Sequence, residues 1–227
     1  MMKKSGFKNY KIRNLKSKIQ NQGGFTLIEL AIVMVIIGII LGAVLKGQDL
    51  IANARAKKAI QWVKEWETAE WSYFDRKGRF AGDGTSSNGV IGDVAGEQTA
   101  TTDAVYEITN ANFINTPAAT ISLGSITFYV FIGHNNETSD KNVIVICKES
   151  DAVCDTTLAS DELLYLESID TSIDGTADVA AGNVRAITAS TSTGAGIAID
   201  AVTEDGAAGA WDTSNTGLVY YYDRPHS

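Results

Sequence analysis

The chain has 227 residues, of which 44% are apolar and 8% aromatic, a composition that fits a folded domain with an appended apolar segment and excludes a disordered chain. Residues 1–24 contain seven basic side chains and no acid, whereas residues 25–227 contain 12 basic and 27 acidic groups, a formal charge of −15. Affinity for nucleic acid comes from clustered Lys and Arg, so no nucleic-acid partner is expected for this acidic portion.

An apolar run follows the basic residues, which are expected to stay on the cytoplasmic side of a membrane. Residues 25–45 carry one charge, Glu29, and as a helix they would be about 31 Å long, close to a hydrocarbon core of about 30 Å. In an ordinary signal peptide small residues follow the apolar region, but here Gly23 and Gly24 precede it. Cleavage after Gly24 would leave the apolar segment on the mature protein; a simple uncleaved anchor is the alternative.

The stretch GGFTLIEL, residues 23–30, closely resembles the cleavage and methylation motif of type IV prepilins and of the pseudopilins of type II secretion. The sequence AIVMVIIGIILGAVL continues it as their first helix does. The resemblance is close over residues 20–60 and only general beyond. It implies that a prepilin peptidase removes the leader 1–24 by cutting after Gly24, and that the new N-terminal residue, Phe25, is N-methylated.

The carboxylate of Glu29 is the unusual feature of the apolar run, because an unpaired charge in hydrocarbon costs several kcal/mol. The resemblance implies that Glu29 of an incoming subunit pairs with the Phe25 amine of a neighbour and sets the axial stagger. The alternative is a carboxylate that snorkels to the headgroups. Gly38 and Gly42 have the spacing that lets apolar helices approach closely, although these glycines could instead be merely tolerated.

The segment 46–76 keeps helical composition but becomes amphipathic. Trp62, Trp66, Ala69 and Tyr73 follow the spacing of one helix face, and we expect this face and the Trp side chains to contact a globular head. A continuous helix over 25–76 would be about 78 Å long. The predicted organisation is therefore a removable leader (1–24), a membrane and filament-core half-helix (25–45), an amphipathic half-helix (46–76) and a head (77–227).

The head is predicted to be an antiparallel sheet with one extra helix, which gives an α+β, type IV pilin-like fold. Glycine-rich residues 76–93 should end the long helix. β-branched and aromatic runs predict a hairpin from 125–133 and 142–149 across a polar loop. Residues 159–175 are typical of a helix with Ser160 as N-cap and Gly175 at its end. Further strands are expected at 183–191, 195–204 and 216–223.

The two cysteines, Cys147 and Cys154, lie beyond the apolar run, in the part that the basic leader would direct out of the cytoplasm. Disulfides persist there, so the pair predicts a disulfide, worth about 2 kcal/mol in a ring this small. Many pilins close a C-terminal loop with a disulfide, but here 73 residues follow Cys154. A metal site is not expected with two cysteines and distant His134 and His226.

Catalytic motifs are missing from the sequence, so we expect no enzyme and no cofactor. His134 is predicted in a polar loop and His226 in the tail, and the scattered acids are predicted to form a solvated face. Residues 83–94 contain several oxygen ligands, but Asn88 and Val94 stand where a calcium loop needs Gly and an acid. No metal is therefore expected.

The leading hypothesis is a structural subunit of an extracellular type IV pilus-like filament. Its partners would be the prepilin peptidase, identical or homologous subunits, the inner-membrane assembly machinery and the membrane. The subunit would wait in the bacterial inner membrane with a cytoplasmic N-terminus and a periplasmic head. The alternative is a type II secretion pseudopilin, although the calcium segment and the shorter head typical of the major pseudopilin are not found. An adhesive or DNA-capturing tip subunit is a weaker alternative.

Overall fold

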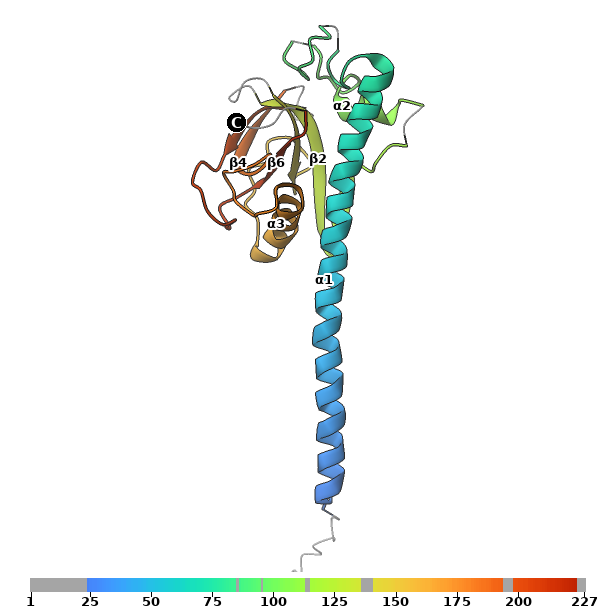
Figure 1. Cartoon of the computed structure of the whole chain (residues 1–227), viewed down its shortest axis with the longest axis vertical. Helices are drawn as coiled ribbons and strands as arrows, with labels where there is room; N and C mark the ends of the chain where they lie inside the picture. The colour runs from blue at the N-terminus through green and yellow to red at the C-terminus, as the bar shows by residue number, and fades with distance from the viewer. Residues whose placement is uncertain are drawn as a thin grey trace, which may run out of the picture. The chain divides into compact units, whose positions relative to one another are not determined.

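The computed structural model describes residues 24–84, 86–94, 96–112, 115–135, 141–193 and 198–223. It divides the chain into two compact units, Met1–Gly47 and Gln48–Ser227. Of the leader predicted for residues 1–24, residues 1–23 lie outside the described residues. Helix α1 begins in the first unit and continues into the second, which contains the remaining elements (Figure 1). The elements are α1 (Leu27–Lys77), α2 (Ala104–Thr109), β1 (Thr120–Leu123), β2 (Ile126–Asn135), β3 (Lys141–Cys147), α3 (Ser160–Asp174), β4 (Val184–Thr193), β5 (Ala198–Glu204) and β6 (Gly217–Tyr221).

These elements confirm the predicted α+β, type IV pilin-like fold, with a long N-terminal helix followed by a sheet. Two short elements, α2 and β1, were not predicted. Helix α2 has six residues and β1 has four, too few for either periodicity to become visible in the sequence.

The amphipathic part of α1 packs on the head within the second unit. The predicted face is buried, and the indole N–H groups of Trp62 and Trp66 both donate to the carbonyl oxygen of Ala118, at 2.6 and 3.2 Å. The third Trp of this helix, Trp71, is 37% exposed and meets the ring of Phe80 edge-on. All three Trp side chains of α1 therefore contact the head, as predicted, with Trp71 packing against the rings of Phe80 and Tyr222.

The sheet has the strand order β1-β2-β3-β6-β4-β5, and the neighbours in this order are antiparallel. A further pairing is parallel, between Gly133 of β2 and Ile199 of β5. Since β3 occupies one edge of β2, β1 and β5 share the other edge. Strands β2, β3, β6, β4 and β5 thus form a closed ring. The sheet is antiparallel, as predicted, with the β2–β5 closing pair as an additional parallel contact.

Both faces of the sheet are covered, because successive side chains in a strand point to opposite faces. In β3, Ile144 and Ile146 belong to a core cluster shared with the three helices, whereas Val143 and Val145 belong to a second cluster. In β6, Leu218 belongs to the first cluster and Tyr221 to the second. The second cluster fills the inside of the ring, which explains why residues 143–147 of β3 and 218–221 of β6 have no alternation of apolar and polar side chains.

The polar loop predicted after residue 133 begins later than expected. His134 and Asn135 continue β2, and Lys141 starts β3, with all three side chains buried. His134 Nδ1 lies 2.8 Å from the carbonyl oxygen of Ile91, and the Ile91 N–H donates to Asn142 Oδ1 at 2.8 Å. These polar side chains are buried because they satisfy the backbone of another loop, a relation that local composition does not encode.

Helix α3 covers part of the sheet and ends at Gly175, as predicted, with Gly175 in the left-handed conformation. Its N-cap is Ala159 rather than Ser160. The Ala159 N–H donates to Glu162 Oε2 at 2.7 Å, and Lys148 Nζ lies 3.0 Å from the same oxygen. The Glu162 carboxylate therefore accepts the hydrogen bond at the helix start, in the place of the cap expected from the Ser160 hydroxyl.

The predicted solvated acidic face is wrong for five acids, which are buried: Glu70, Asp83, Glu97, Asp103 and Asp170. Asp170 of α3 illustrates the cause. Its Oδ2 accepts hydrogen bonds from the Trp211 indole at 2.9 Å and from the Asp178 N–H at 3.0 Å. Burial raises the pKa of Asp170 to about 6, against the lowering effect of these two hydrogen bonds.

This raised pKa predicts a pH-dependent stability. Below about pH 4 Asp170 is protonated in both folded and unfolded chains, and between about pH 4 and pH 6 the folded chain retains the proton more strongly. Stability contributed by Asp170 should therefore fall as the pH rises through this window. In thermal unfolding of the detergent-solubilised chain, Asp170→Asn should flatten this fall, while the exposed control Asp161→Asn should follow wild type. Parallel curves for Asp170→Asn and wild type would contradict the assignment.

Candidate assembly and processing site

The first turn of α1 is closed by Thr26 and Glu29. The Thr26 N–H and hydroxyl both donate to Glu29 Oε2 at 2.8 Å, and the Glu29 N–H donates back to Thr26 Oγ1 at 3.2 Å. This reciprocal arrangement is a capping box, which satisfies backbone donors at a helix start. In the single chain the Glu29 carboxylate therefore already has partners, and both residues are exposed.

The rest of this unit is an exposed apolar helix. Every residue from 24 to 46 is exposed, including Phe25 at 84% and Leu27 at 88%. Among the described residues, α1 is the one helix long and apolar enough to cross a membrane. A helix that is apolar on all sides needs a lipid or protein cover. The sequence motif at residues 23–30 and this helix together fit membrane anchoring before assembly.

Gly38 and Gly42 lie one helical turn apart on α1. A Cβ atom built at either position would meet nothing within 4 Å. No neighbour among the residues that the structure describes therefore requires a glycine at these positions. Close packing against another helix stays a prediction, and so does the alternative that both glycines are simply tolerated.

Gly24 and Phe25 precede the helix, in residues without regular secondary structure at the start of the described chain. Gly24 is exposed, and an added Cβ would again meet nothing within 4 Å. A larger side chain at this position should therefore leave the fold unchanged, so its effect can be attributed to recognition by a peptidase.

Substitution Gly24→Val is expected to block leader removal, because a prepilin peptidase must fit the residue at the cleaved bond. The variant should keep residues 1–24, visible as a larger mass and slower migration of the membrane-bound protein. Gly206→Val is a matched control in the head, where an added Cβ also meets open space. A Gly24→Val protein that still begins at Phe25 would refute the processing assignment.

Cys147 and Cys154 form a disulfide, with their Cα atoms 5.7 Å apart. Cys147 ends β3, and both sulfur-bearing residues are fully buried in the second core cluster beside Ala152. The bridge therefore fastens the loop 148–153 to the inside of the ring.

A closed bridge predicts that the exported protein contains no free thiol. Alkylation with a thiol reagent under denaturing, non-reducing conditions should add no mass, whereas prior reduction should allow two labels. Labelling of both cysteines without reduction would show that the Cys147–Cys154 bridge is not formed in the exported protein.

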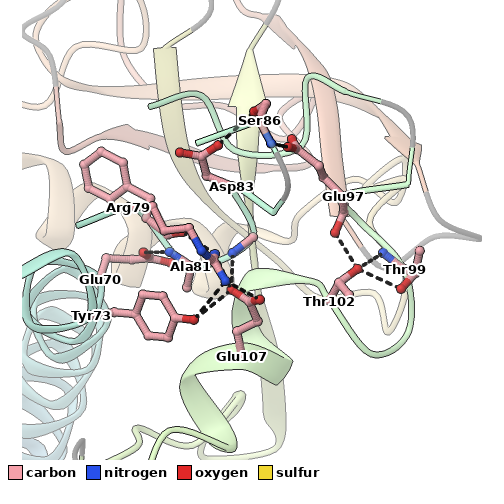
Figure 2. A network of polar contacts seen from close by, with 12 residues as sticks. Glu70, Tyr73, Arg79, Ala81, Asp83, Ser86, Glu97, Thr99, Thr102 and Glu107 are labelled. Carbon is pink, nitrogen blue, oxygen red and sulfur yellow. Dashed lines mark hydrogen bonds and ion pairs between the residues drawn. The ribbon is translucent and has the colours of Figure 1, made fainter. Parts of the chain in front are cut away.

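The loop after α1 is held by a polar network (Figure 2). The two terminal guanidinium nitrogens of Arg79, Nη1 and Nη2, donate to Glu107 at 2.8 and 2.9 Å, and the Gly82 N–H donates to the same carboxylate at 2.9 Å. Burial alone would raise the pKa of Glu107, but the hydrogen bonds from Arg79 and Gly82 outweigh it and lower the pKa. Burial and the nearby Glu107 raise the pKa of Tyr73 to about 12. This network is structural, since it joins α1, the loop and α2.

Asp83, one of the oxygen ligands of the calcium loop considered from the sequence, forms hydrogen bonds within the same loop. Asp83 accepts hydrogen bonds from the Ser86 hydroxyl at 3.1 Å and the Gly89 N–H at 2.9 Å, and Thr85 lies outside the described residues. Within the part of the chain that the structure describes, no three His, Cys, Asp or Glu side chains form a group able to hold a metal ion.

Thr26 and Glu70 were missed by sequence reasoning although a signal was present for each. Thr26 has the Thr-x-x-Glu spacing of a capping box with Glu29, visible in TLIE. Glu70 lies four residues after Trp66 and three before Tyr73, which places it on the buried face of α1. Attention to apolar residues alone passed over both.

The family model described as the prokaryotic N-terminal methylation motif matches residues 19–45. The match confirms the resemblance inferred from the Gly, Phe and Glu spacing, and it covers Gly24, Phe25, Glu29, Gly38 and Gly42. Comparison with curated proteins and with solved structures gave no match.

Proposed function

We propose, from the premise that residues 19–45 carry the leader signature of type IV prepilins and pseudopilins, that this chain is a structural subunit of an extracellular type IV pilus-like filament. Prepilin peptidase cuts after Gly24, and Phe25 becomes the methylated N-terminus. The mature subunit waits in the inner membrane with its head in the periplasm. Inner-membrane assembly machinery then transfers it into a filament of identical or homologous subunits.

The exposed first part of α1 is the observation that carries the proposal. Its apolar side chains are uncovered in the single chain, and the lone carboxylate is satisfied locally by Thr26. Lipid can cover such a helix before assembly, and the equivalent helices of neighbouring subunits can cover it afterwards. Burial of this apolar surface stabilises the helix both in the membrane and in the filament. A single chain in solution would leave the same surface exposed to water.

The proposed role is structural rather than enzymatic, and the position of His134 supports it. Its Nδ1 is paired with the Ile91 carbonyl, and its Nε2 lies 3.8 Å from Asp200 Oδ1. The ring is buried with 3% exposure and joins the sheet to the loop after α1. These contacts give His134 a role in fold stability.

Electron microscopy of filaments sheared from cells tests the proposal, with an antibody against the head. The antibody should decorate the filament shafts, and decoration should disappear in the Gly24→Val strain, where unprocessed protein stays in the membrane. Undecorated filaments, together with loss of protein secretion when the gene is deleted, would instead identify a secretion pseudopilin.

A further inference from the structure

Two carboxyl groups accept hydrogen bonds from adjacent backbone amides of the loop that follows α1. Glu70 of α1 accepts the Ala81 N–H through Oε2 at 3.2 Å, and Glu107 of α2 accepts the Gly82 N–H through Oε2 at 2.9 Å (Figure 2). The loop start is therefore held between two acids from different helices.

Among the residues that the structure describes, a cation pairs with only one of these two acids. Arg79 binds Glu107 with two hydrogen bonds, a bidentate geometry that commits its charge to that carboxylate. Glu70 is fully buried, and its Oε1 has no hydrogen-bond partner among the described residues. An ionised carboxylate in such a dry position is costly.

The other groups that face Glu70 do not balance a negative charge. They are Tyr73 on α1, Arg79 on the loop, Glu107 on α2, and Tyr222 and Asp223 after β6; Glu67 of α1 faces Tyr222 in turn. The Tyr222 hydroxyl is buried without a hydrogen-bond partner among the described residues, and its ring packs against Phe80, next to Ala81. The site is aromatic and acidic, and the Arg79 guanidinium beside it is already paired with Glu107.

We infer that Glu70 is a protonated carboxylic acid that latches the loop start to α1, and that the latch opens when alkaline solution removes its proton. The charged form would face Glu107 and Asp223 in a dry site, so the carboxylate must turn toward water and release the Ala81 N–H. Burial raises the pKa of Glu70 well above its ordinary value, against the lowering effect of the Ala81 hydrogen bond. The folded chain thus keeps a proton that the unfolded chain loses, and the latch weakens as the pH rises through the folded-state pKa.

Amide hydrogen exchange in the mature full chain, held in detergent micelles, tests this inference. After correction for the intrinsic pH dependence of exchange, protection of the Ala81 amide in wild type should fall about tenfold per pH unit above the pKa of Glu70. Glu70→Gln is neutral at every pH and should keep its protection constant. The exposed neighbour variant Glu65→Gln should follow wild type. A Glu70→Gln profile that falls in parallel with wild type would overturn the inference.

A second measurement needs no substitution. The ¹³C resonance of the Glu70 carboxyl in wild-type protein should keep the chemical shift of a protonated acid through neutral pH. It should change in the same pH range in which Ala81 loses protection. An ionised Glu70 at neutral pH would refute the latch even if the Gln variant failed to fold.

Discussion

Replacing Glu29 with Ala is expected to abolish filaments while leaving leader cleavage and the head intact. The substitution removes the one charge of the apolar span and lies far along the chain from the head core. In a filament, however, it would leave the Phe25 amine of a neighbour buried without its carboxylate. Removal of one partner from a buried ion pair costs about 3–5 kcal/mol, and the same loss would recur at every subunit contact. The variant should accumulate in the membrane as processed monomer.

The capping box supplies a control for this experiment. Thr26→Val removes the hydroxyl that binds Glu29 in the single chain but retains the carboxylate. If pairing between subunits is the essential role of Glu29, Thr26→Val should still form filaments. Co-expression with wild type gives a second readout, because Glu29→Ala subunits should be excluded from filaments or stop their growth. Even incorporation of Glu29→Ala along filaments of normal length would favour the snorkelling alternative.

The second large effect is expected at Gly133, where the ring of strands closes. A Cβ atom at this position would lie 2.1 Å from the carbonyl oxygen of Ile199 and 2.9 Å from its backbone nitrogen. Both are backbone atoms of the paired strand β5, so no side chain can move aside. Gly133→Ala should therefore separate β5 from β2 and destabilise the head by about 3 kcal/mol, at the upper end for an overpacked core.

Thermal unfolding of the detergent-solubilised chain, followed by Trp fluorescence, measures this effect. For a chain of this size the melting temperature should fall by about 6–12 °C. Gly206→Ala is the matched control, because an added Cβ there meets open space. A Gly133→Ala protein that melts with wild type would show that the closing pair between β2 and β5 is not formed.

The sequence carried enough information to predict the elements that have a strong local signal. The apolar run, the Trp spacing and the β-branched runs predicted α1, the β2–β3 hairpin and the later strands, and Gly175 predicted the end of α3. The processing motif was also recognisable, because it depends on a short, fixed spacing around Gly24 and Glu29.

The unpredicted features depend on contacts between residues remote in the sequence. Ring closure rests on the approach of Gly133 to Ile199, and the burial of His134 rests on the backbone of Ile91. Glu70 is buried because the loop after α1 folds back against the helix and the Ala81 N–H donates a hydrogen bond to its carboxyl group. Composition and periodicity describe how a segment faces a core, but they do not identify which backbone group will meet a polar side chain there.

The filament role itself is tested most directly by the N-terminal mass of the subunit in filaments sheared from cells. We expect the filament protein to lack residues 1–24 and to begin with N-methylated Phe25, with the Cys147–Cys154 bridge intact. Filaments that contain the chain with its leader still attached, or sheared filaments that lack the chain altogether, would contradict the proposed role.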